Sequence, residues 1–124
     1  MRCKLVIPAK LPGLNEYVSA ERANPFKAAK LKKDTETFIC YCIKQQLRGV
    51  RFEKPVKIAF LWFEKNRRRD KDNIAFAKKF VQDALVNSGV LANDGWKEIA
   101  GFKDEFFVDS ENVRVEVIIR ELGE

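Results

Sequence analysis

The spacing of apolar residues divides the chain into four predicted strands and two main predicted helices. A short first strand is predicted at Lys4–Pro8, where proline ends it. Val56–Phe63 has apolar residues on both faces, which predicts a central strand covered on both sides. Glu98–Val108 alternates imperfectly and residues 113–120 alternate clearly, which predicts a third and a fourth strand.

Helical spacing occurs in two segments. Asn24 is a suitable N-cap, Pro25 suits the first helical position, and an apolar stripe continues from there to about Leu47. Residues 70–89 are typical of a loop leading into a second helix, and residues 15–21 of one isolated helical turn. The order β-α-β-α-β-β predicts an α+β (α/β-like) fold. We expect a single domain over residues 1–124, with helices packed on a small mixed four-stranded sheet.

Composition and charge narrow the classes of function. Lysine and arginine total 24 against 18 acidic residues, which gives a net charge of +6 and an isoelectric point near 9.3. Such an excess favours polyanionic partners, nucleic acid first. Uncharged apolar runs reach only about five residues, so neither a membrane span nor a signal peptide is expected.

The residues that are rare or absent exclude further chemistry. The three cysteines show no CxxC spacing, which is typical of reduced thiols in a cytoplasmic protein. The sequence contains no histidine, which excludes histidine-based zinc sites and histidine-dependent triads. It also has no glycine-rich phosphate loop, so no nucleotide cofactor is expected. Catalysis would have to come from Asp, Glu, Lys and a metal ion.

Acidic residues set among arginines mark the stretch 67–97. Asp70 and Asp72 are two residues apart, which places both carboxylates on one side of an extended segment. Mg²⁺ takes hard oxygen ligands, so the pair is a candidate metal site; a solvated loop is the alternative. Arg67, Arg68 and Arg69 directly precede the acids and are interpreted as a clamp for phosphate, again with a solvated loop as the alternative.

The helix after the acids is predicted to place a lysine behind them. With a start near Asp72 and about 100° of rotation per residue, positions 72, 76, 79 and 83 fall within about 60° of one another. Lys79 and Asp83 then form an i,i+4 pair, which is typical of an ordinary salt bridge. The functional interpretation is a lysine directed at the scissile phosphate, with Asp83 orienting it or binding metal. Lys78 points elsewhere and is kept as the alternative lysine.

Asp94 and Trp96 follow this helix. The local sequence around Asp94, Asn-Asp-Gly, is typical of a simple turn, but a third carboxylate on such a loop would complete a metal cluster. Trp62 is predicted to lie in the core. For Trp96 a core position is favoured over stacking on an exposed base.

Three motifs together resemble one family. They are Arg-Arg-Arg-Asp-x-Asp-Asn at 67–73, a helical lysine followed by Asp-Ala-Leu at 83–85, and Gly-Val-Leu-x-Asn-Asp at 89–94. This combination resembles the RusA family of Holliday-junction resolvases, small endonucleases of which many are encoded by phages and prophages. The resemblance implies a homodimeric, Mg²⁺-dependent endodeoxyribonuclease, with Mn²⁺ as a substitute metal. It further implies paired nicks in four-way DNA junctions, in recombination and repair, leaving 5′-phosphate and 3′-hydroxyl ends.

Carried over by position, the resemblance implies that Asp70, Asp72 and Asp94 are the catalytic metal-binding acids, with Asp83 as a weaker further ligand. The sequence departs from the family at the helix lysine, because Phe76 stands where the best-known form has lysine. Counting back from Asp83 gives Lys79, which the helical-face argument also selects. Lys78 joins the three arginines as a predicted DNA contact.

Two alternatives stay open beside the resolvase. One is a metal nuclease that acts on other branched DNA, such as flaps or forks. The other is a basic DNA-binding protein whose acids are structural and which has no catalytic activity. The resemblance implies a location in the cytoplasm of a bacterial or phage-infected cell.

Overall fold

The computed structural model describes residues 1–123 and contains one four-stranded sheet. The strands are β1 (Arg2–Ile7), β2 (Val56–Glu64), β3 (Ile99–Val108) and β4 (Arg114–Glu121). Their order in the sheet is β1-β4-β2-β3; β2 and β3 are parallel and the other neighbours antiparallel. The helices are α1 (Leu14–Ala23), α2 (Pro25–Gln46), α3 (Lys71–Ala75) and α4 (Lys78–Asn87). The predicted α+β fold with a mixed four-stranded sheet is confirmed.

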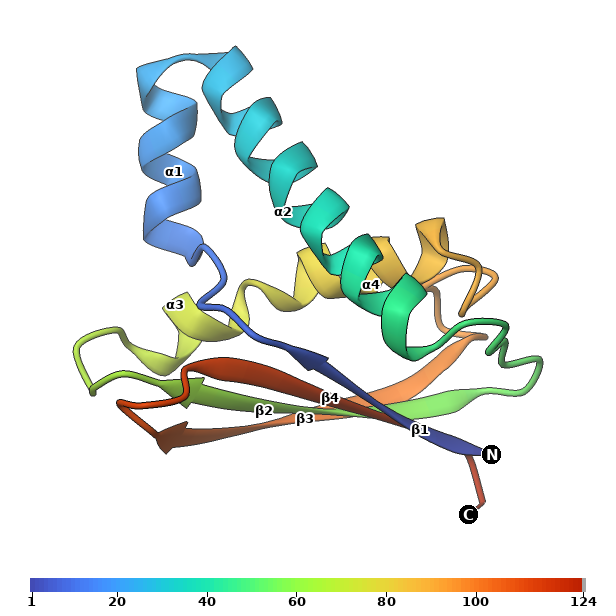
Figure 1. Ribbon diagram of the computed structural model, residues 1–124. Coiled ribbons are helices and arrows are strands. Elements are labelled where there is room, and N and C mark those ends of the chain that lie inside the picture. The colour runs from blue at the N-terminus through green and yellow to red at the C-terminus, as the bar shows by residue number, and fades with distance from the viewer. Residues whose placement is uncertain (124) are drawn as a thin grey trace.

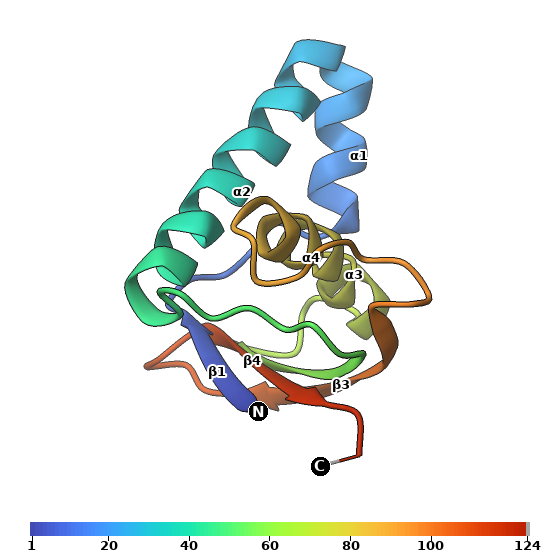
Figure 2. The ribbon, with the colours of Figure 1, turned by 90° about the vertical axis from the view of Figure 1, so that its right-hand side faces the viewer.

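All four helices lie on one face of the sheet, as both ribbon views show (Figures 1 and 2). Alternate residues of β2 point into this layer, so Ile58, Phe60 and Trp62 are buried and pack in one core with Phe80 and Leu85 of α4. Burying an apolar side chain of this size contributes roughly 1.5–3 kcal/mol. Trp62, predicted in the core, is 1% exposed.

The opposite face of the sheet has no covering layer. β2 is an inner strand, but its other side chains, Ala59, Leu61 and Phe63, are only half-buried. The prediction that this strand is covered on both sides is therefore wrong. We call this uncovered side of the sheet the open face.

The first predicted helix is confirmed in detail. The Asn24 side chain accepts a hydrogen bond from the Lys27 amide at 2.9 Å, and Pro25 occupies the first turn of α2. The helical turn expected at residues 15–21 is a ten-residue helix, α1, which begins directly after Gly13.

The second predicted helix is interrupted. Residues Phe76 and Ala77 form a turn between α3 and α4, and the amides of Ala77, Lys79 and Phe80 bond three residues back, which tightens the chain. The Phe76 ring packs 5.6 Å from Tyr17 and 5.7 Å from Phe80, so the turn is held by its own aromatic side chain. No helix within residues 1–123 is both long and apolar enough to cross a membrane.

Candidate functional site

The loop between β2 and α3 places two carboxylates in one hollow of about 850 Å³, which we call the acidic hollow. Asp70 is the N-cap residue of α3, but its side chain makes no capping hydrogen bond. Asp72 lies in the first turn and is exposed. Within residues 1–123 neither carboxylate forms an ion pair, although the chain is strongly basic. Both are therefore available to an external cation.

Exposed cations border the acidic hollow. Arg67 lines it and Arg68 lies beside it in the same loop, and both are exposed. Lys71 also lines it, with its Nζ 5.7 Å from the centre of the Phe106 ring. Two carboxylates with cationic neighbours can bind a metal ion and the phosphate groups that approach it.

Arg69 differs from the other two arginines because its guanidinium is used inside the fold. Nε and Nη2 donate to the two carboxylate oxygens of Glu64 at 2.9 and 2.8 Å, and Nη1 donates to the Leu11 carbonyl at 3.0 Å. Its side chain is 13% exposed. The predicted clamp of three arginines therefore reduces to Arg67 and Arg68.

A close packing contact joins the start of α1 to α3, the helix that follows Asp70 and contains Asp72. The side-chain Oδ1 of the buried Asn73 accepts a hydrogen bond from the Asn15 amide at 2.8 Å, which ties α3 to the start of α1. A Cβ atom on Gly13 would lie 2.6 Å from that oxygen and 2.8 Å from the Asn73 carbonyl oxygen. Glycine is thus required for the close approach of these two segments.

Three other predicted residues, Lys79, Asp83 and Asp94, line a second hollow of about 400 Å³ between α2 and α4, which we call the α4 hollow. Lys79 is 59% exposed there, and its Nζ lies 3.1 Å from Asp83 Oδ1, so the predicted i,i+4 pair is confirmed. Asp94 lines the same hollow from the loop after α4. The hydrogen bond that Lys79 donates to Asp83 raises the pKa of Lys79, and Asp94 adds to this shift through its charge.

Glu36 of α2 also lines the α4 hollow and is not predicted from the sequence. Its Oε1 is buried without a hydrogen-bond partner, and Lys32 Nζ lies 3.9 Å away. Burial raises the pKa of the Glu36 carboxyl; the charge of Lys32 opposes this and the neighbouring Asp83 adds to it. Its i,i+4 spacing from Lys32 is that of an ordinary surface pair, so the sequence contains no signal for a functional role.

The interruption at 76–77 separates the two hollows. Asp70 and Asp72 line one, and Lys79, Asp83 and Asp94 line the other, so the continuous helix assumed from Asp72 to Asp83 is interrupted. Among residues 1–123 no three acidic or cysteine side chains form a group that would hold one metal ion. The predicted cluster of three aspartates is not assembled within this single chain.

The donor set of the acidic hollow still suits magnesium. Mg²⁺ is commonly held by one or two carboxylates, with waters and substrate phosphates completing its shell. Asp70 and Asp72 meet that smaller requirement, because both are exposed and neither is paired.

Two further residues, Lys78 and Trp96, lie in surroundings that differ from those predicted. Lys78 forms an ion pair with Asp104, and its Nζ lies 4.8 Å from the centre of the Phe102 ring, so it is held against β3 and not free for DNA. Trp96, expected in the core, is 99% exposed in the loop beyond Asp94. The alternative reading of Trp96, stacking on a base, therefore gains support.

Comparison of the sequence with models of known protein families gives no match, and comparison with curated proteins gives none.

Proposed function

We propose that this protein is a Mg²⁺-dependent endodeoxyribonuclease that resolves four-way DNA junctions by paired symmetric nicks, as a homodimer, in recombination and repair. The observation that carries the proposal is the pair Asp70 and Asp72: two exposed carboxylates without ion-pair partners, in one hollow bordered by Arg67 and Lys71. In a chain of net charge +6, acids left unpaired among cations favour a role in binding a cation.

Each residue has a distinct part in this proposal. Asp70 and Asp72 would hold the metal ion, and Arg67, Arg68 and Lys71 would bind phosphates on either side of the scissile bond. Bound Mg²⁺ supplies Lewis acidity and a water of lowered pKa.

A four-way junction has near two-fold symmetry, so two equivalent strands must be cut. A C₂ dimer presents two equal sites in matching geometry, which is why we include the homodimer in the proposal.

Asp72→Asn tests the proposal on a synthetic four-way junction in Mg²⁺ or Mn²⁺. We expect nicking to fall at least about a hundredfold, since the metal loses a charged ligand, while junction binding is kept or strengthened. Asp34→Asn is the matched control, because Asp34 is an exposed member of the surface pair with Lys30 on α2. Nicking unchanged by Asp72→Asn would reject the enzyme. Flaps cut as fast as junctions by the unaltered protein would reject the resolvase.

The α4 hollow requires a separate test. Asp94→Asn and Lys79→Ala remove the residues that lie apart from Asp70 and Asp72 in the single chain. If both hollows serve one reaction across two copies, a mixture of inactive Asp72→Asn and Asp94→Asn chains will recover part of the nicking activity. No recovery, with Asp94→Asn fully active alone, would restrict the catalytic site to the acidic hollow.

The second candidate function is a basic DNA-binding protein without catalysis. The separation of Asp94 from Asp70 and Asp72 favours it. It predicts junction binding that is independent of Mg²⁺ and no nicked product with either metal.

A further inference from the structure

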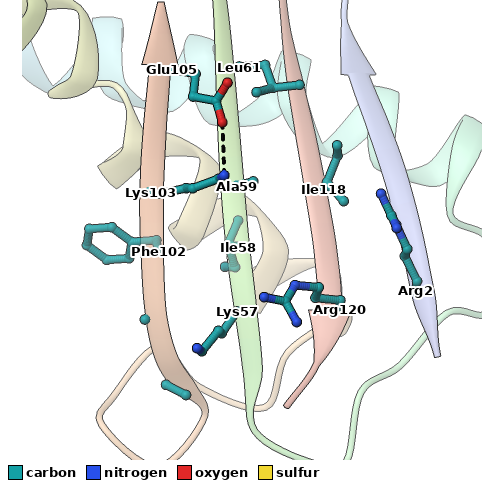
Figure 3. A pocket seen from close by; sticks show the side chains of 12 residues that line it. Arg2, Lys57, Ile58, Ala59, Leu61, Phe102, Lys103, Glu105, Ile118 and Arg120 are labelled. Atoms are coloured by element: carbon teal, nitrogen blue, oxygen red, sulfur yellow. Dashed lines mark ion pairs between the residues drawn. The ribbon is translucent and has the colours of Figure 1, made fainter. Parts of the chain in front are cut away.

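The proposed function does not use the open face of the sheet. Its side chains alternate with the core residues along each strand, and they surround a hollow of about 620 Å³. Figure 3 shows Ala59, Leu61 and Ile118 along its centre, with Lys57 and Arg120 near one end.

Three cations lie side by side at that end. Arg120 of β4 is the register partner of Arg2 on β1 and of Lys57 on β2, so one row crosses three strands with a positive charge at each position. We call it the cationic row. Like charges directly opposite one another destabilise a sheet. Within residues 1–123 neither Arg2 nor Lys57 forms an ion pair, so both side chains remain available to an anion.

The whole open face is positive. Six cationic side chains point to it against two carboxylates of the strands, and Asp109, directly after β3, binds Arg114 at 3.0 Å, so the net charge is +3, whereas the entire chain carries +6. The cations are Arg2, Lys4, Lys57, Lys103, Arg114 and Arg120, and the carboxylates are Glu105, Asp109 and Glu116. A second copy on this face would set +3 against +3, which opposes association, whereas a polyanion is complementary to it.

The other end of the open face is aromatic. The rings of Phe63 and Phe107 stack with centroids 4.8 Å apart, and the Arg114 guanidinium lies 3.7 Å from the centre of Phe63. Phe107 is 41% exposed and also lines the acidic hollow. Phe63 lies six positions after Lys57 on β2, a span of about 20 Å along the strand.

We propose that the open face binds a single strand of DNA. The cationic row holds its phosphates together with Lys103, which pairs with Glu105 at 2.9 Å but, unlike Lys78, is 70% exposed. Phe107 stacks on a base at the end nearest the acidic hollow. Positive surfaces combined with exposed aromatic rings bind single strands because unpaired bases offer their faces for stacking. A duplex conceals those faces and presents only its phosphates. The inference concerns binding alone and does not require the proposed nicking.

Fluorescence anisotropy with a labelled oligothymidylate of about 15 nucleotides tests this on the full chain, in a chelator so that no metal-dependent cleavage occurs. Phe107→Ala is expected to weaken binding about tenfold, since one stacked base is lost. Phe26→Ala is its control, because Phe26 is an exposed ring at the start of α2. Phe107→Leu keeps an apolar side chain on the strand without a ring and should weaken binding similarly, which separates lost stacking from misfolding.

Lys57→Glu tests the cationic row. It should weaken binding and lower the salt dependence of log K by about 0.7 per lost phosphate contact. Lys44→Glu makes the same charge change on α2 and should leave the slope unchanged. Equal affinity for duplex of the same length, or Phe107 variants that bind like the unaltered chain, would overturn the proposal. So would a dimer, seen by sedimentation, that Lys57→Glu strengthens and that excludes the oligonucleotide.

Discussion

Replacing Arg69 tests whether this arginine stabilises the fold, in contrast to the exposed Arg67 and Arg68, which are proposed to bind DNA. The Arg69 guanidinium binds both carboxylate oxygens of Glu64, the Leu11 carbonyl and, at 3.5 Å, Glu16, so replacing it removes four hydrogen bonds at once. The Glu64 side chain is only 12% exposed. Arg69→Met therefore leaves a nearly buried carboxylate without its cation.

The size of the effect follows from that burial. Breaking a buried ion pair by removing one partner costs about 3–5 kcal/mol, because the remaining charge is uncompensated. A domain of this size has a free energy of unfolding of about 5–15 kcal/mol, so Arg69→Met is expected to leave the protein folded but weakly stable. In the double variant Glu64→Gln/Arg69→Met no charge is buried, and we expect it to be about 1–3 kcal/mol more stable than Arg69→Met alone.

Urea denaturation followed by circular dichroism measures these differences. Arg68→Met is the matched control; it removes an exposed neighbour and should change the free energy of unfolding by less than about 0.5 kcal/mol. A loss below about 1 kcal/mol for Arg69→Met, or a double variant less stable than the single one, would refute the structural role assigned to Arg69.

Three further predictions concern the surroundings of the two hollows. Gly13→Ala should cost about 1–3 kcal/mol in urea denaturation, because its Cβ would meet Asn73; an unchanged midpoint would contradict the contact. Burial raises the pKa of Glu36, so the folded chain holds that proton more tightly than the unfolded chain, and the related stability is lost as pH rises through the raised pKa. Glu36→Gln should therefore stabilise the protein near pH 7 but not below about pH 4; equal gains at both pH values would exclude this cause. Trp96→Ala should leave stability within about 0.5 kcal/mol, since the side chain is exposed, but weaken binding to branched DNA; unchanged affinity would exclude base stacking.

Local patterns predicted the elements well where one signal dominated. Asn24 and Pro25 defined the start of α2, and the alternation of β2 and β4 identified both strands, because capping and period-two burial act over a few residues. The sequence did not reveal that β2 has one open face. Its second set of apolar residues is the same whether a layer or solvent lies over it.

The candidate site was predicted less well, because the local sequence does not show how neighbouring segments are arranged in the folded chain. Asp70 and Asp72 share a hollow because two residues of separation suffice to place them together. Lys79 was assigned to them by extrapolating one helical phase through Phe76, where the chain instead turns. Arg69 looked equivalent to Arg67 and Arg68 in the sequence, and only the position of Glu64 in the folded chain distinguishes it.

The place of Asp94 is fixed by the segment before it, and this bears on how the three aspartates would meet. Val90 and Leu91 are 1% and 2% exposed, and both amides donate to the Leu85 carbonyl, at 3.0 and 3.2 Å, so the loop is anchored at the end of α4. A movement that released both side chains to carry Asp94 to the acidic hollow would lose roughly 1.5–3 kcal/mol for each. An association of two copies that set an acidic hollow against an α4 hollow would unite the aspartates without exposing this core. The mixture of Asp72→Asn and Asp94→Asn chains therefore distinguishes movement of the Asp94 loop within one chain from a site shared between two copies. Only a shared site regains activity when the two inactive chains are combined.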